Sequence, residues 1–292
     1  MNLPEFKGRR TPSAIAAGLE VARVVVTHDA FTRAFERSMD LVQTLPALKM
    51  PGGILIQAAS GMGKTLLLKL IEQQVEANAP AGRVGRCLYL KMDSGVDNPK
   101  LGRMLARALG YPAFPTRLNS EVVDGMIETG LEKAKPAAFL IDEFHHVCTG
   151  NRDITATHIA DWVKVRLDAT RIPFVGVGTM LLERMEAIND QFTGRVSASN
   201  TIPVFTFGED WRRVLASYCQ QVTKVDMHVL NGQVAHTLHE ASKGNMRALK
   251  KILIFGAMHA ASRNDAKLNL EDLAIGYADI MEKAGRANPL LP

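Results

Sequence analysis

A run of small residues followed by Lys64 and Thr65 has the residue types needed to hold a phosphate group. An apolar stretch at residues 54–56 precedes it, and a helix-forming apolar stretch at residues 66–71 follows it. Strand, tight loop and helix start, in this order, are the context of a P-loop, whose backbone N–H groups surround a phosphate. A lysine placed there reaches the β- and γ-phosphates, and the next hydroxyl binds Mg²⁺. We therefore predict a site for a nucleoside triphosphate and Mg²⁺.

The loop departs from the full P-loop pattern at one position. That pattern begins with glycine, and the corresponding residue here is Ala58. The strand and helix around the loop still favour a P-loop over an ordinary strand-to-helix turn. The expected nucleotide contacts are Ser60, Gly61, Met62, Gly63, Lys64, Thr65 and Leu66.

Two carboxylates, Asp142 and Glu143, end an apolar stretch at residues 137–141. Such a stretch predicts a strand buried on both faces, as in a parallel sheet between helix layers, and ligands bind at the carboxyl ends of such strands. We expect Asp142 to hold Mg²⁺ through its water shell and Glu143 to orient or deprotonate the attacking water. His145 and His146 follow, but the absence of spaced partner ligands disfavours a zinc site, and a helix start beside the site is favoured.

A further buried strand, predicted at residues 172–178, ends in Thr179. In a nucleotide-binding sheet such a hydroxyl can bind the γ-phosphate or the attacking water. Capping the helix predicted at residues 180–188 is a compatible second role. The loop expected at residues 189–200 contains Arg195.

Strands separated by helices predict a doubly wound α/β domain with a five-stranded parallel sheet. The expected strands lie at residues 54–56, 87–92, 137–141, 172–178 and 201–207. Beyond residue 208 the strand signals stop and helical patterns predict a separate lid. The predicted organisation is an N-terminal arm and helical segment at 1–50, a P-loop domain at 51–208 and a helical lid at 209–292.

The N-terminal segment has a mostly helical pattern between residues 11 and 43, with a break expected at residues 27–29. Apolar residues recur there at helical spacing and predict one buried face. In the first half of the segment, this predicted face consists of Ile15, Leu19, Ala22 and Val26.

A capped helix predicted at residues 98–110 carries basic side chains on one face, and the loop after it adds another. These residues are Lys100, Arg103, Arg107 and Arg117. Lysine and arginine neutralise nucleic-acid phosphates, so the group is the best candidate for a nucleic-acid contact surface. The alternative is a solvated helix face, because no aromatic residues are interleaved for base stacking.

Composition narrows the class of protein. The 292 residues are 47% hydrophobic and 22% charged, as in soluble globular proteins. No apolar run is long enough for a membrane helix, and the first residues lack a signal-peptide core. The three cysteines lie far apart without C-x-x-C spacing, so we expect a cytoplasmic protein without a disulfide framework. The net charge of +5 weakly favours a polyanionic partner.

Taken in order, these motifs resemble those of the AAA+ ATPases. Within that class, the TniB/TnsC family of transposition regulators has segments similar to KMPGGILIQAASGMGKT, LIDEFHHV, VGVGT, QFTGRV and NPKLGRMLARALGYP. The resemblance extends from about residue 15 to about residue 285. Bacterial helicase loaders and origin-binding initiators share many of these motifs.

The resemblance implies roles for individual residues in binding and hydrolysing ATP with Mg²⁺. Walker A is Gly61, Gly63, Lys64 and Thr65; Walker B is Asp142 and Glu143; sensor 1 is Thr179; sensor 2 is Arg247. Arg195, rather than Arg184, is the expected arginine finger, which reaches the ATP of a neighbouring subunit.

The resemblance also implies partners. Members of the TniB/TnsC family form homo-oligomeric rings or filaments on double-stranded DNA, and ATP hydrolysis controls this assembly. They recruit a transposase, in some cases with a target-selection adaptor. DNA would face residues 100–117. The alternatives are a helicase loader or replication initiator, and a nucleotide-switch signalling NTPase without DNA binding. No nuclease carboxylate triad is visible, so we do not expect DNA cleavage.

Overall fold

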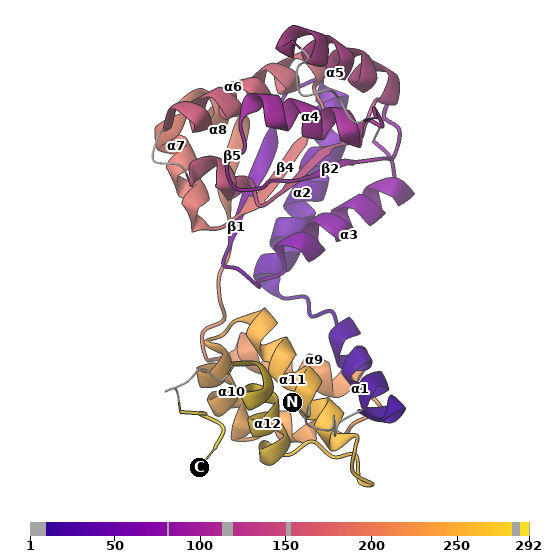
Figure 1. Ribbon diagram of the computed structural model, residues 1–292, viewed down its shortest axis with the longest axis vertical. Helices are drawn as coiled ribbons and strands as arrows, with labels where there is room; N and C mark the ends of the chain where they lie inside the picture. Colours follow the sequence, from indigo (N-terminus) through magenta and orange to yellow (C-terminus); the bar gives the residue numbers. More distant parts are fainter. Residues whose placement is uncertain (1–9, 81, 113–118, 150–152, 282–286, 292) are drawn as a thin grey trace, which may run out of the picture. The chain divides into compact units, whose positions relative to one another are not determined.

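The computed structural model describes residues 10–80, 82–112, 119–149, 153–281 and 287–291 (Figure 1). The chain divides into two compact units, one of residues 29–203 and the other of residues 1–28 together with 204–292.

The larger unit is built on a five-stranded parallel sheet, which confirms the predicted α/β fold. Its strands are β1 (Gly53–Ala58), β2 (Leu88–Lys91), β3 (Phe139–Asp142), β4 (Phe174–Gly178) and β5 (Val196–Ile202). They lie in the order β2-β3-β4-β1-β5, so β1 is flanked by β4 and β5. Because all pairs are parallel, the carboxyl ends of β1, β3 and β4 meet at one edge of the sheet.

Helices cover both faces of this sheet (Figure 1). They are α2 (Asp29–Leu48), α3 (Lys64–Ala77), α4 (Asn98–Ala108), α5 (Ser120–Ala134), α6 (Asp153–Thr170), α7 (Arg184–Ile188) and α8 (Asp190–Arg195). Helices α2 and α3 pack on one face. The buried residues of α4, α5 and α6 form a core with Leu55, Ile141 and Phe174 of the strands on the other face. Burial on both faces explains why β1, β3 and β4 are mostly apolar, with Gln57 and Asp142 as their buried polar residues.

The fifth strand differs from its prediction. It was expected at residues 201–207, but β5 begins at Val196, and α8 lies where a loop was expected. The sequence of β5, VSASNTI, is mostly polar and gives no hydrophobic strand signal. Its backbone pairing with β1 specifies the strand instead.

Helices make up the described part of the smaller unit. They are α1 (Pro12–Arg23), α9 (Glu209–Gln221), the 3₁₀ helix η3 (His228–Asn231), α10 (Val234–Ser242), α11 (Met246–Ala260) and α12 (Leu270–Met281). The four α-helices after residue 208 match the predicted positions of the lid helices to within a few residues. The break expected at residues 27–29 lies between α1 and α2.

Helix α1 buries a different face from the predicted one. Its buried residues are Ala14, Ala17, Gly18 and Val21, whereas Ile15 and Leu19 are about half exposed. Small side chains let α1 approach α11 closely, and a Cβ atom at Gly18 would lie 2.7 Å from Met258 Cγ. This packing joins α1 to the C-terminal helices, whereas residues 29–50 belong with the sheet. The predicted boundaries at residues 50 and 208 therefore differ from those of the compact units.

Candidate nucleotide-binding site

The predicted P-loop connects β1 to α3 and uses its glycines for their backbone conformation. Gly61 and Gly63 have φ angles of 87° and 89°, which other residues rarely adopt. Ala58, where the pattern has glycine, is the buried last residue of β1 and is not among the residues with positive φ. Alanine is therefore tolerated at this position.

Lys64 is the first residue of α3, and its side chain turns back over the loop. Its Nζ donates hydrogen bonds to the carbonyl oxygens of Ala58 and Ala59, at 3.0 and 3.2 Å. The residue is only 5% exposed. The loop carbonyls thus hold a positive charge beside the helix start, where a phosphate group binds most favourably.

Thr65 and Asp142 lie side by side although 77 residues separate them in the sequence. Thr65 Oγ1 donates a hydrogen bond of 2.7 Å to Asp142 Oδ2, and Asp142 is 1% exposed. The backbone N–H of Glu143 donates to Asp142 Oδ1 at 2.8 Å. A hydroxyl and a carboxylate held together are hard oxygen ligands and fit Mg²⁺, which keeps most of its water shell.

The sequence did not indicate a third group at this carboxylate, Tyr89. It lies on β2, next to β3, and its hydroxyl donates to Asp142 Oδ2 at 3.0 Å. Burial, together with the negative charge of Asp142, raises the pKa of Tyr89, so the phenol remains a hydrogen-bond donor at neutral pH. Its place in a predicted strand was the available signal, but its contact depends on the order of the strands.

Glu143 follows Asp142 with a φ angle of 55°, and the 3₁₀ helix η1 (Phe144–Cys148) begins directly after it. Ligand atoms of Glu143, His145 and His146 lie within 4.8 Å of one another. The two imidazole rings are stacked, however, with their centroids 4.5 Å apart and 28° between their planes. Lone pairs in nearly parallel rings do not converge on one ion, so this arrangement does not fit a metal centre.

Thr179 directly follows β4 and precedes the 3₁₀ helix η2 (Met180–Glu183). Its side chain makes no capping hydrogen bond, and Oγ1 is buried without a hydrogen-bond partner in the described part of the chain. Since β4 pairs with β3, Thr179 lies at the same sheet edge as Asp142. A buried hydroxyl without a partner in the protein is suited to binding a ligand or water.

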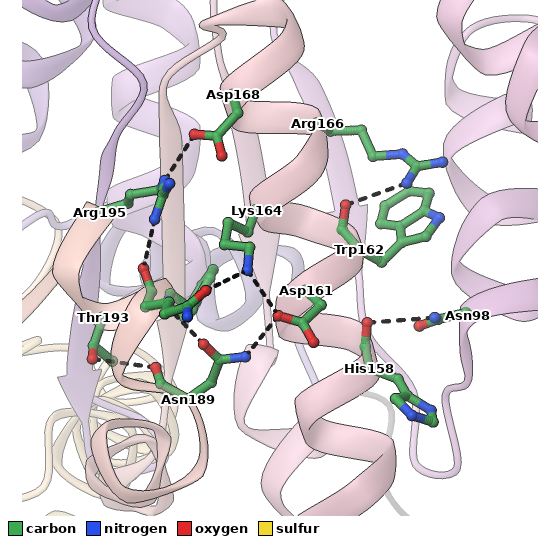
Figure 2. A network of polar contacts seen from close by, with 12 residues as sticks. Asn98, His158, Asp161, Trp162, Lys164, Arg166, Asp168, Asn189, Thr193 and Arg195 are labelled. Atoms are coloured by element: carbon green, nitrogen blue, oxygen red, sulfur yellow. Dashed lines mark hydrogen bonds and ion pairs between the residues drawn. The ribbon is translucent and has the colours of Figure 1, made fainter.

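Arg195 is the last residue of α8, and its polar contacts hold it against α6 (Figure 2). Its Nε donates to Asp168 at 2.7 Å, and its Nη1 donates to the carbonyl oxygen of Gln191 at 3.1 Å. The start of α8 is fixed to α6 as well, because Asn189 donates to Asp161. Within the described ranges, the polar contacts of Arg195 are thus with α6 and its own helix, and not with the P-loop.

Arg184, the alternative to Arg195, and Arg247, the predicted sensor 2 residue, also have defined positions. Arg184 donates to the carbonyl oxygen of Cys148 at 2.7 Å and to Asp153 at 2.8 Å. Arg247 lies in the first turn of α11, in the smaller unit, where the side chain of Asn245 caps its backbone N–H. A contact of Arg247 with nucleotide stays a prediction.

The candidate DNA-binding residues of α4 lie on its outer side, since Leu101 and Leu105 pack into the core. Lys100 forms an ion pair of 3.6 Å with Asp93, Arg103 is half-buried and Arg107 is exposed. Arg117 lies outside the described residues.

Comparison with known proteins identifies the family. The model of the family described as bacterial TniB protein matches residues 20–205, more than half of the chain. The chain belongs to the TniB family. No curated protein matches its sequence.

Solved structures share the fold of this TniB-family chain, which is that of the AAA+ ATPases. The Aeropyrum pernix ORC1 protein in complex with DNA has a TM-score of 0.65 at 17% identity, over 90% of this chain and 69% of that one. Cdc6p from Pyrobaculum aerophilum has a TM-score of 0.60 at 16% identity, over 92% and 72%. Domain III of the Thermotoga maritima replication initiation protein DnaA has a TM-score of 0.54 at 15% identity, over 94% and 100%.

None of the helices in the described ranges combines the length and the apolar character that crossing a bilayer requires.

Proposed function

We propose that this TniB-family chain is an ATP-dependent, DNA-binding regulator of transposition, which assembles on target duplex DNA, recruits a transposase and hydrolyses ATP to control assembly. The observation that carries the proposal is the 2.7 Å contact between Thr65 and Asp142 beside the loop of Gly61 and Gly63. It joins the two motifs that a hydrolytic P-loop site needs. The structure of the Aeropyrum pernix ORC2 protein in ADPNP-ADP complexes adds a nucleotide-bound protein of the same fold.

Each group at the site has a role in this proposal. Lys64 binds the β- and γ-phosphates, while Thr65 and Asp142 hold Mg²⁺, which when bound neutralises charge on the phosphates. Glu143 accepts a proton from the attacking water or orients it, and Thr179 binds that water or the γ-phosphate. The backbone N–H groups of residues 60–66 bind the phosphates at the start of α3. Arg247 would reach the nucleotide as sensor 2.

Arg195 acts on the ATP of a neighbouring subunit. It lies at the end of α8, where the side chains of its ion pair with Asp168 are 36% and 40% exposed, and this ion pair can be exchanged for one with a phosphate. A finger supplied in trans makes hydrolysis depend on assembly and contributes about 10³- to 10⁵-fold to the rate. We therefore expect Arg195→Ala to leave ATP binding intact and to abolish duplex-stimulated hydrolysis. Arg184→Ala is the matched variant, and an equal loss there would contradict the assignment.

DNA contacts are assigned to α4. Phosphate contacts without base reading suit a regulator that accepts many target sequences. Removing the charges of Lys100, Arg103 and Arg107 should weaken binding to all duplexes and lower the salt slope by about 0.9 for each phosphate that is no longer neutralised. Lys133→Ala changes an exposed lysine of α5 and should leave binding unchanged. Unaltered binding and salt dependence in the α4 variant would place DNA elsewhere.

Assembly tests the proposal as a whole. Negative-stain images of the chain with a non-hydrolysable ATP analogue should show rings or filaments only when random-sequence duplex is also present. Particles that stay monomeric on duplex would overturn it.

A second candidate is a replication initiator or helicase loader, favoured by the fold shared with ORC1, Cdc6p and DnaA domain III. It predicts nucleotide-dependent binding to a helicase or to single-stranded origin DNA, and no capture of a transposase. Co-purification with the transposase or with the replicative helicase of the same cell distinguishes the two functions.

A further inference from the structure

We propose that His145 is a positioning residue for hydrolysis, holding one carboxylate oxygen of Glu143 so that the other faces the attacking water. The inference rests on the proposed ATPase function and names a residue that the P-loop and Asp-Glu motifs do not include.

The first observation is the contact between the two side chains. His145 Nδ1 lies 3.3 Å from Glu143 Oε2, which is close enough for an ion pair. The angle of this contact, however, is not that of a well-formed hydrogen bond. Nδ1 is buried and has no hydrogen-bond partner among the described residues. Since a buried ring nitrogen without a partner is costly, and Glu143 is the carboxylate beside it, a small rotation of that carboxylate satisfies the nitrogen.

The second observation is that the histidine itself is held in place. His145 is 8% exposed, and its ring stacks on that of His146. Its backbone also packs against β4, because a Cβ atom at Gly178 would lie only 2.9 Å from His145 N. A ring with so little freedom can restrain a partner, whereas a surface histidine cannot.

The third observation concerns the glutamate, whose carboxylate is in ion-pair reach of His145 and has no side-chain hydrogen bond among the described residues. Its side chain is 30% exposed, and its backbone is fixed by the left-handed conformation at the end of β3. Because the carboxylate rotates about bonds that the backbone does not restrain, a contact at its end decides where both oxygens point. A general base must face its water within hydrogen-bond distance.

The protonation of the ring agrees with this role. Burial lowers the pKa of His145, against the opposing effect of Glu143, so the imidazole is neutral and one nitrogen carries the proton. A proton on Nδ1 is donated to Glu143, and the contact then needs no charge on the histidine.

Four variants test the inference by steady-state hydrolysis with saturating duplex. His145→Ala removes the ring, His145→Asn keeps a donor near the position of Nδ1, and His145→Gln moves the donor outward. His158→Ala, at an exposed histidine of α6, is the control. We expect kcat to fall about 10- to 100-fold in the alanine and glutamine variants, with the KM for ATP unchanged, because a displaced base costs that much. The asparagine variant should recover most of kcat, and the control should stay near wild type.

The comparison separates positioning from folding. Asparagine and glutamine differ only in where the amide lies, so equal kcat values in these two variants would overturn the inference even if the alanine variant unfolds. In a Glu143→Gln background, His145→Ala should cause no further loss, and an added tenfold loss would contradict the coupling.

The result also separates this inference from the proposed function. A wild-type chain without ATP hydrolysis would overturn both. Hydrolysis that is lost in Glu143→Gln but is normal in His145→Ala would leave the ATPase in place and reject the role of His145.

Discussion

Gly178→Ala tests whether β4 and η1 are packed as closely as the site requires. Gly178 is the last residue of β4, and its φ angle is not in the left-handed region, so alanine is allowed by the backbone there. The added Cβ atom would lie 2.9 Å from His145 N and 2.8 Å from Leu182 Cδ1. The first distance is 0.5 Å short of ordinary contact, which begins at 3.4 Å.

The two contacts differ in their cost. Leu182 can move its terminal methyl group, but His145 N is backbone and can move only together with η1. Overpacking of this kind destabilises a protein by roughly 1–3 kcal/mol. At about 2 kcal/mol, the midpoint of thermal unfolding of a unit this size should fall by roughly 4–8 °C. The shift of η1 should also lower kcat, because it moves His145 away from Glu143.

Gly125→Ala is the matched control. Gly125 lies within α5, and a Cβ atom there meets nothing within 4 Å. Alanine in place of glycine in a helix interior should stabilise the larger unit by about 0.5–1 kcal/mol. Thermal unfolding and ATP hydrolysis of both variants are compared with wild type. If Gly178→Ala unfolds at the wild-type temperature, the close packing of η1 on β4 is refuted.

Two further variants test hydrogen bonds to buried carboxylates. Tyr89→Phe removes one donor to Asp142, and the Mg²⁺ concentration needed for half-maximal hydrolysis should rise about 10-fold; an unchanged Mg²⁺ titration would contradict a role for Tyr89. Asp272→Asn should destabilise the helical unit by about 3 kcal/mol, because Asp272 is fully buried and accepts hydrogen bonds from Arg263 and His259. Burial raises the pKa of Asp272, but these hydrogen bonds outweigh burial, and the pKa is lowered. The stabilisation by Asp272 is therefore fully present above the pKa of the unfolded state. It is lost as the pH falls through the pKa of the folded state. Urea unfolding from pH 7 down to pH 3 should therefore show that the difference in free energy of unfolding between wild type and Asp272→Asn becomes smaller as the pH falls. A difference that stays constant would contradict the lowered pKa.

Local sequence patterns predicted the parts of the site that are continuous in the chain. The P-loop and the Asp-Glu strand each combine a buried strand with functional residues directly after it. The apolar pattern and the functional residues are therefore adjacent in the sequence. Tyr89 could not be found in this way, because its contact with Asp142 depends on β2 lying beside β3.

Where the predictions were wrong, contacts with distant parts of the chain outweighed local hydrophobicity. The strand β5 is mostly polar and is specified by its ladder with β1. In α1, close approach to α11 favours small residues such as Ala14 and Gly18, and it leaves Ile15 and Leu19 about half exposed. Neither effect is visible from residue types within a single segment.

The most direct test of the account is the binding of labelled random-sequence duplex, followed by fluorescence anisotropy with and without a non-hydrolysable ATP analogue. We predict tight binding by the wild-type chain only with the analogue, and none by Lys64→Ala under either condition. Binding that is equally tight without nucleotide, or that survives in Lys64→Ala, would contradict the claim that the P-loop site controls assembly on DNA.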